Sequence, residues 1–134
     1  MTEMTAAQSR NLHVGIDIGS TTVKAVVLDA DTNEELFGVY RRHGSQQIQA
    51  TLRVLDEIVA RFPLSHIRCA LCGSGSEDIA HGIGAPFIQE VVAGATAVRA
   101  LYPQANCTIE LGGQDAKMIF FRHDESGVQE LGDM

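Results

Sequence analysis

Several residue types are scarce in this sequence or missing from it. It contains no tryptophan, only three cysteines and three prolines, and aromatic residues make up 5% of the chain. Three cysteines do not build a disulfide framework, and an odd number is typical of a reducing compartment, so we expect a cytoplasmic protein. No apolar run approaches the ~20 residues that cross a bilayer, and the polar residues 1–11 lack the apolar centre of a signal peptide.

Basic residues are also few. Ten lysines and arginines stand against 17 acidic residues, which gives a formal net charge of −7 at pH 7. Such a charge disfavours nonspecific attraction to nucleic acid and to anionic membrane surfaces, and we expect neither as a partner. What the chain does have is apolar residues, 45% of 134, which is enough for a buried core.

The spacing of the apolar residues predicts an order of strands and helices. Three strands are predicted first, at 12–18, 22–28 and 35–42. Apolar residues three and four apart over 46–62 predict an amphipathic helix, which Pro63 ends. The further predicted elements are a strand at 67–72, a short helix or loop at 77–84, a brief strand at 86–89, a helix at 91–101 and strands at 107–111, 116–121 and 128–131. This order indicates an α/β fold of the ribonuclease-H-like type, a mixed sheet flanked by helices.

Two short segments of the chain repeat one pattern. Residues 17–24 read Asp-Ile-Gly-Ser-Thr-Thr-Val-Lys, and residues 110–117 read Glu-Leu-Gly-Gly-Gln-Asp-Ala-Lys. In each, a carboxylate, an aliphatic residue and a glycine lead into a polar turn that a lysine follows. Because apolar strands flank both segments, the repeat indicates a duplicated strand–turn–strand unit. We predict a flexible leader at 1–11, a first subdomain at 12–104 and the start of a second, duplicated subdomain at 105–134.

Turns of this composition are suited to binding phosphate. Glycine lets backbone amides point into one concavity, where they can hold phosphate oxygens, and two facing turns can grip a polyphosphate. The carboxylates of Asp17 and Glu110, each at the end of a strand, are predicted to hold Mg²⁺ directly or through water. The candidate phosphate-binding residues are Gly19, Ser20, Thr21, Thr22 and Lys24 in the first turn and Gly112, Gly113, Gln114, Asp115 and Lys117 in the second. Each turn alone is also compatible with an ordinary hairpin, and each lysine with an exposed place on its strand.

Three other features are assigned structural roles. Cys69 and Cys72 form a C-x-x-C, but residues three apart on a strand point to opposite faces, so we predict that these two and Cys107 are small buried residues. The segment 73–76, Gly-Ser-Gly-Ser, lacks the Gly-Lys-Ser/Thr of a Walker loop and is predicted to be a structural turn. The five histidines have no ligand spacing, and we place them on the surface or in turns.

The repeated motifs resemble those of a known superfamily. Residues 14–24 look like the first phosphate motif of the acetate kinase, sugar kinase, heat-shock chaperone and actin superfamily. Residues 109–117 resemble the second phosphate motif of one branch, whose Gly-Gly-Gln-Asp-x-Lys core is more specific. That branch holds the ATP-dependent activators of 2-hydroxyacyl-CoA dehydratases and benzoyl-CoA reductases, the BadF/BadG-type ATPases. The turn at 72–76 is similar to the family's Thr-Gly-Ser-Gly, with Cys72 in place of threonine.

The resemblance also implies roles for two acidic residues. Residues 89–93 are similar to the family's Asn-Glu-Ile-Thr-Ala, which makes Glu90 the candidate catalytic residue that positions the attacking water or its Mg²⁺, together with Asp17. Position 110 is commonly aspartate in the family, and glutamate here resembles the long, multi-domain members. The longer side chain shifts the carboxylate by roughly one methylene, so that the contact to the metal is expected either to become water-mediated or to change its geometry.

The family's properties set the functional expectation. The resemblance implies ATP and Mg²⁺ as cofactors and, in the complete protein, a homodimer with one [4Fe-4S] cluster between the subunits. It implies a dehydratase or reductase as the partner protein, which receives a low-potential electron when ATP is hydrolysed. In the family the adenosine-binding segment and the cluster cysteines follow the second hairpin, so we expect ATPase activity in the complete protein and an inactive, cluster-free chain here. Two alternatives stay open: a small-molecule kinase, of a sugar or amino sugar, and a non-catalytic actin-like nucleotide-binding module.

Overall fold

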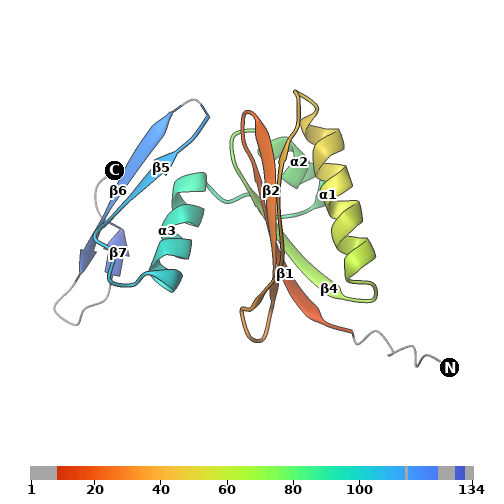
Figure 1. Cartoon of the computed structure of the whole chain (residues 1–134), viewed down its shortest axis with the longest axis horizontal. Coiled ribbons are helices and arrows are strands. Elements are labelled where there is room, and N and C mark those ends of the chain that lie inside the picture. Colours follow the sequence, from red (N-terminus) through yellow and green to blue (C-terminus); the bar gives the residue numbers. More distant parts are fainter. Residues whose placement is uncertain (1–8, 114, 124–128, 132–134) are drawn as a thin grey trace. The chain divides into compact units, whose positions relative to one another are not determined.

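The order of helices and strands follows the predicted order. The computed structural model describes residues 9–113, 115–123 and 129–131. The elements are β1 (Asn11–Ile18), β2 (Thr22–Asp29), β3 (Glu35–Arg42), α1 (Gln47–Arg61), β4 (His66–Cys72), α2 (Glu77–Ile83), α3 (Glu90–Leu101), β5 (Cys107–Leu111), β6 (Ala116–His123) and β7 (Gln129–Leu131) (Figure 1). The brief strand predicted at 86–89 is reduced to one isolated bridge between Leu71 and Phe87.

The chain divides into two compact units, Met1–Phe87 and Ile88–Met134. By this division α3 belongs with β5, β6 and β7, whereas the predicted subdomains place it at the end of the first one. The predicted boundary between residues 104 and 105 marks the start of a duplicated domain, which a division into compact units does not test. That boundary therefore stays a prediction.

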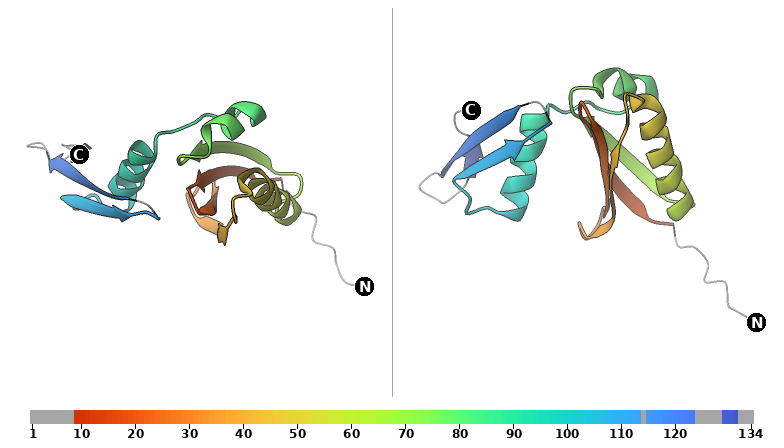
Figure 2. Two further views of the ribbon diagram at one scale, coloured as in Figure 1. Left: turned by 90° about the horizontal axis from the view of Figure 1, so that it is seen from above. Right: turned by 45° about the horizontal axis from the view of Figure 1, so that its top comes forward.

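The first unit contains a four-stranded mixed sheet in the order β3-β2-β1-β4. β1 pairs antiparallel with β2 and parallel with β4, and in the parallel register Asp17 lies opposite Cys72. The carboxyl ends of β1 and β4 therefore meet at one edge of the sheet, so that the turns that follow both strands lie at that edge. α1 runs along one face of this sheet in both further views (Figure 2). The predicted mixed sheet flanked by helices is confirmed.

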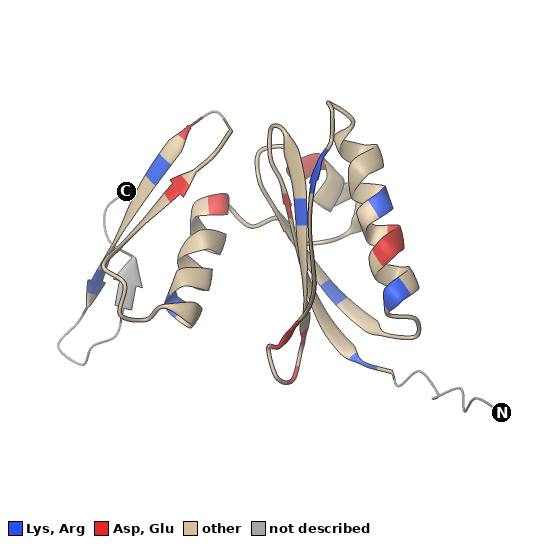
Figure 3. Cartoon of the chain, in the orientation of Figure 1, with Lys and Arg blue, Asp and Glu red and all other residues tan. Residues whose placement is uncertain are grey.

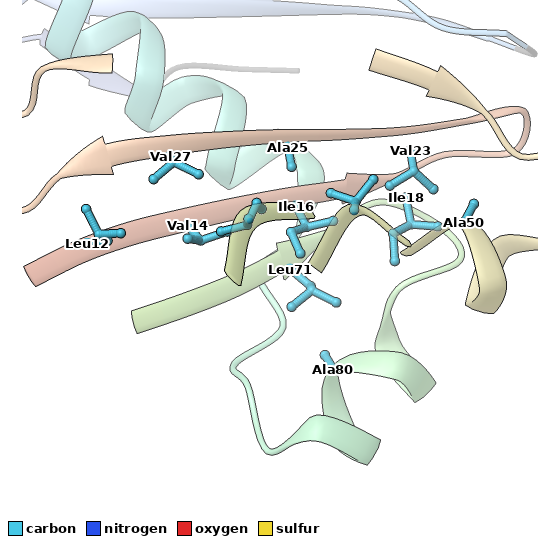
Figure 4. Packing of buried hydrophobic residues seen from close by; sticks show 12 residues of the cluster. Leu12, Val14, Ile16, Ile18, Val23, Ala25, Val27, Ala50, Leu71 and Ala80 are labelled. Carbon is cyan, nitrogen blue, oxygen red and sulfur yellow. The ribbon is translucent and has the colours of Figure 1, made fainter. Parts of the chain in front are cut away.

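The core of the first unit comes from alternation along β1 and along β2 from Val23 onward. Every second side chain of these strands is buried on the helical face, and Ile18 and Val23 are fully enclosed. The buried set consists of Leu12, Val14, Ile16, Ile18, Val23, Ala25, Val27, Ala50, Val54, Ile58, Leu71 and Ala80 (Figure 4). A fully buried aliphatic side chain contributes about 1.5–3 kcal/mol, so this cluster anchors β1 firmly. Since side chains alternate along a strand, Asp17 is directed away from the core.

The second unit contains a three-stranded antiparallel sheet in the order β5-β6-β7. α3 packs on one face of it through a small cluster in which Ala95 meets Ile119 and Phe121, with Val91 and Val98 beside them. This packing is what places the first residue of α3, Glu90, near the β5–β6 hairpin.

Charged residues of both signs lie along α1 (Figure 3). Glu57 pairs with Arg61 one turn further along the helix and with Arg41 on β3, which adds a polar link between the helix and the sheet. Exposed pairs of this kind contribute about 0–1 kcal/mol, far less than the apolar core. Among the helices in the described ranges, none combines the length and the apolar character needed to cross a membrane.

Candidate phosphate-binding site

The first hairpin is closed by a tight turn at residues 19–22. The Gly19 amide donates to the Thr22 carbonyl oxygen at 2.9 Å, and the side chains of Asp17 and Lys24 stand opposite each other on the two strands. The Lys24 Nζ lies 2.8 Å from Asp17 Oδ2, and both side chains are partly exposed. Lys24 therefore faces the carboxylate beside the turn, and its side chain is 40% exposed, so both its predicted role at phosphate and the alternative of an exposed strand position stay open.

The other carboxylate oxygen of Asp17 is buried and has no hydrogen-bond partner among the described residues. A buried carboxylate oxygen without a partner is costly, and such atoms commonly belong to sites for a cation or an ordered water. Oxygen is also the ligand type that Mg²⁺ prefers. Asp17 thus fits the predicted role beside a metal ion, with Lys24 balancing its charge on the opposite side.

The turn at 73–76 lies directly against the first hairpin. The Gly75 amide donates to the Ile18 carbonyl oxygen at 3.1 Å, and the Ser76 hydroxyl donates to the Gly73 oxygen at 2.8 Å. Gly73 has a φ of +98°, and a Cβ at this position would come within 2.5 Å of Asp17 Oδ1 and 2.4 Å of the Ile18 oxygen. Only glycine fits there. The segment is a structural turn, as predicted, and it also forms one wall beside Asp17, which its sequence alone did not indicate.

The second hairpin repeats the geometry of the first. The Gly112 amide donates to the Asp115 oxygen at 2.8 Å, and Glu110 stands opposite Lys117 across the strands. The donor and acceptor of the closing bond, and the carboxylate and lysine, all occupy equivalent places in the two sequence repeats. Gly112, Gly113 and Asp115 are exposed at this turn, whereas Gln114 lies outside the described residues. The repeated strand–turn–strand unit is therefore a structural repeat as well.

The lysine of the second hairpin has a different main partner. Lys117 Nζ lies 3.0 Å from Glu90 Oε2 and 3.9 Å from Asp115 Oδ2. The hydrogen bond to Glu90 raises the pKa of Lys117 above its usual range, against the opposing effect of partial burial, and the charges of Glu90, Asp115 and Glu110 act in the same direction as that bond. Glu90 is the first residue of α3, where the helix dipole favours a negative charge. The structure thus brings the candidate catalytic glutamate to the second hairpin.

The candidate residues fall into two groups, one in each unit. Asp17, Lys24 and residues 19–22 belong to the first unit, with Ser20 and Thr21 exposed at the tip and Thr22 buried. Glu90, Glu110, Lys117 and the described residues of 112–115 belong to the second. Each group lies within its own unit. It stays a prediction that both groups contact one ligand.

Cys69 and Cys72 point to opposite faces as predicted, but both are only half-buried. Cys69 pairs in register with the buried Val14 and Cys72 with Asp17, so the two thiols lie on opposite faces of the sheet. Burial raises the pKa of the Cys69 thiol. Cys107 is exposed, so the prediction of a buried residue is wrong there, because the face of β5 that carries it is open in the second unit. In the described ranges, no three His, Cys, Asp or Glu residues are grouped so that they could hold a metal ion by themselves.

One histidine lies in a turn, one of the two predicted settings, but is buried there. His43 is 7% exposed, and its Nε2 lies 3.0 Å from the carbonyl oxygen of Gly19 in the first hairpin. The chain that follows β3 contacts the hairpin, so that the ring of His43 lies against the turn. Nothing in the spacing of the histidines indicates this; the Gly-Ser turn that directly follows His43 is the feature that distinguishes it in the sequence.

Two structures similar to this chain are dehydratase activators. Component A of (R)-2-hydroxyglutaryl-CoA dehydratase from Acidaminococcus fermentans superposes with a TM-score of 0.70 at 24% identity and covers 88% of this chain and 44% of its own. The activator of the 2-hydroxyisocaproyl-CoA dehydratase from Clostridium difficile, with ADPNP bound, gives a TM-score of 0.69 at 25% identity, with coverages of 91% and 46%. This chain thus spans less than half the length of either activator.

A third similar structure shares the fold. The ethanolamine utilization protein EutJ from Carboxydothermus hydrogenoformans has a TM-score of 0.59 at 21% identity and covers 96% of this chain and 53% of its own. Neither protein-family models nor curated protein sequences gave a match. The resemblance to dehydratase activators that the phosphate motifs indicated is confirmed in structure, and the chain has the actin-like ATPase fold.

Proposed function

We propose that this chain provides the two phosphate-binding hairpins of an ATP-hydrolysing activator, which drives low-potential electron transfer to a 2-hydroxyacyl-CoA dehydratase or a benzoyl-CoA reductase. The observation that supports this most is the structural repeat. Two hairpins close by the same glycine amide bond and carry a carboxylate opposite a lysine at equivalent positions. Backbone amides at such turns bind phosphate oxygens, and a pair of them suits a polyphosphate.

The proposed cofactors are ATP and Mg²⁺. Asp17 and Glu110 would hold the metal together with phosphate oxygens and water, because Mg²⁺ in nucleotide sites takes only one or two protein carboxylates. The unpartnered Oδ1 of Asp17 supports this assignment. When bound, Mg²⁺ offsets the negative charge that builds up on the phosphates during transfer. The ADPNP in the Clostridium difficile activator supports a nucleotide as the ligand of this fold.

The residues of this chain would contribute to hydrolysis by positioning and charge. Glu90 would orient the attacking water or its metal ion, and its ion pair with Lys117 fixes the carboxylate at the start of α3. Lys24 and Lys117 would supply positive charge beside the phosphates. Phosphoryl transfer depends mainly on such positioning and on electrostatic stabilisation.

The electron-transfer part of the proposal rests on the likeness to the activators alone. A [4Fe-4S] cluster needs several thiolates close together, whereas Cys69 and Cys72 face opposite sides of the sheet. These two cysteines therefore do not fit as ligands of one cluster. The cluster, the homodimer and the dehydratase or reductase partner are proposed for the complete protein only.

Four measurements on the complete protein test the proposal. We expect Mg²⁺-dependent hydrolysis of ATP, and ATP-dependent reduction of a purified 2-hydroxyacyl-CoA dehydratase under anaerobic conditions. Transfer of the γ-phosphate to a sugar or amino sugar would select the kinase alternative instead. Nucleotide-dependent assembly without turnover would select the actin-like binding module.

A further inference from the structure

The buried His43 makes hydrogen bonds through both nitrogens of its ring. Its Nδ1 accepts from the Ser45 amide at 3.1 Å, and its Nε2 lies 3.0 Å from the Gly19 carbonyl oxygen. A ring nitrogen that accepts a hydrogen bond carries no proton, and a carbonyl oxygen only accepts, so Nε2 must be the nitrogen that donates. These two partners therefore select the neutral ring with its proton on Nε2.

The turn that follows β3 is built so that Ser45 can reach the ring. The Gln46 amide donates to the His43 oxygen at 2.9 Å, and Gly44 and Ser45 have φ values of +54° and +64°, as in a type I′ turn. Serine rarely adopts this left-handed region, because its Cβ comes too close to the carbonyl oxygen there. The strained turn directs the Ser45 amide at Nδ1. This contact leaves the ring proton on Nε2, the nitrogen that faces the hairpin.

Residues 43–47, called the His43 segment, also donate a hydrogen bond to a second carbonyl oxygen of the hairpin. The backbone amide of His43 donates to the Thr21 oxygen at 3.1 Å, and Gln47 Nε2 donates to the Gly19 oxygen at 3.4 Å. In a trans peptide the C=O and the N–H of one unit point in opposite directions. Because the oxygens of Gly19 and Thr21 are tied to the His43 segment, the amides of Ser20 and Thr22, in the same two peptide units, are directed away from it.

We propose that His43 is a positioning residue of the first phosphate hairpin, and that its Nε2 proton fixes the direction of the Ser20 amide toward bound phosphate. This inference rests on the proposed function, since it needs the hairpin to bind phosphate. His43 acts through the peptide between Gly19 and Ser20. Gln47 supports the same carbonyl oxygen with a longer bond.

A matched pair of variants separates the two sides of the ring. In His43→Gln the side-chain amide nitrogen takes the place of Nε2, so the donor to Gly19 is retained and the contact to Ser45 is lost. In His43→Asn the side-chain oxygen takes the place of Nδ1, so the contact to Ser45 is retained and the donor to Gly19 is lost. Each variant keeps one hydrogen bond, and a role in stability alone would affect both to a similar degree.

The readout is the affinity of the complete protein for Mg²⁺–ADPNP. We expect His43→Gln to bind within about twofold of the unchanged protein and His43→Asn to bind about tenfold more weakly, the effect of losing one neutral hydrogen bond. The same changes at the exposed His13, on the other end of β1, should leave the affinity unaltered. Equal affinities of the Gln and Asn variants of His43 would overturn the proposal.

A measurement without nucleotide keeps this inference separate from the proposed function. The ¹⁵N spectrum of the unchanged chain at neutral pH should show His43 protonated on Nε2, and protonation on Nδ1 would overturn the inference even if neither variant folds. The amide shift of Ser20 should move in His43→Asn and stay in place in His43→Gln. Absence of Mg²⁺–ADPNP binding by the unchanged complete protein, with these NMR results as expected, would reject the proposed function and leave the bonding of the ring to the hairpin established.

Discussion

The two hairpins of this chain have the same geometry and very different surroundings. In the first, Ile18 and Val23 flank the turn and are fully buried beneath the helices of the unit. Their counterparts in the second repeat are Leu111 and Ala116, and Leu111 is 80% exposed. On the same open face Ile109, Met118 and Phe120 are also exposed, because α3 covers only the other side of β5 and β6.

Formation of the hairpin and burial of the apolar face of the sheet have different requirements. The closing bond from glycine to the third residue after it, and the register of carboxylate opposite lysine, form in both places. Local sequence is therefore sufficient for the hairpin itself. Burial of the apolar face depends on a helix from elsewhere in the chain, which the first hairpin has and which the described part of the second unit lacks on this face.

The largest expected effect tests this difference in cover. Ile18→Ala should lower the free energy of unfolding of the first unit by about 2–5 kcal/mol, since it opens a cavity in a closed core. Leu111→Ala at the equivalent place should change the second unit by less than about 0.5 kcal/mol, because the side chain is mostly in solvent already. Urea titration followed through amide NMR signals of each unit measures both. Equal losses would mean that the second face is covered in solution.

The next effect tests the two carboxylates beside the turns. Asp17→Asn in the complete protein should lower ATP turnover about 10²-fold, because it removes negative charge from the atom that has no other partner. Glu110→Gln should have a smaller effect, about tenfold, if the longer side chain holds the metal through water. A steady-state ATPase assay over a range of Mg²⁺ concentrations gives both values. Unchanged turnover in Asp17→Asn would remove this residue from the site.

Much of the fold could be predicted because it follows from local patterns of apolar residues in the sequence. Alternation along β1 and β2 and the spacing of three and four in α1 gave element bounds close to those observed. The repeat of residues 17–24 at 110–117 gave the two hairpins and the pairing of carboxylate with lysine.

What the sequence did not reveal depends on contacts between distant segments. His43 contacts a turn 24 residues earlier in the chain, and Gly73 lies against Asp17 in the turn that follows the neighbouring parallel strand. The exposure of Cys107 likewise depends on which face of β5 is covered, and a strand pattern does not say which helix covers it. Only the arrangement of the sheet brings such residues together.

A smaller effect tests the role of Glu90 at the second hairpin. Glu90→Ala should lower turnover about tenfold and leave nucleotide affinity within about twofold, since a residue that orients water acts mainly in the transition state. Lys117→Met removes the partner of Glu90 and serves as the matched variant: it should weaken nucleotide binding more than it lowers turnover. Loss of affinity with unchanged turnover in Glu90→Ala would assign that residue to binding instead.

The smallest effect distinguishes the two units by the pH at which each loses stability. In the second unit the pKa of Lys117 is raised, first of all by its hydrogen bond to Glu90, so the folded state holds this proton more tightly than the unfolded state. The stabilisation is complete at neutral pH and is lost as the pH rises above about 10. The side chain is 34% exposed and solvent screens the pair, so the contribution is less than about 1 kcal/mol.

In the first unit the backbone amides of Thr32 and Asp31 lower the pKa of Asp29, so its stabilisation is present at neutral pH and is lost in acid. Unfolding titrations of Lys117→Met and Asp29→Asn should therefore approach the unchanged protein at opposite ends of the pH range. A Lys117→Met difference that persists undiminished at high pH would show that packing, and not the ion pair, is the source of its effect.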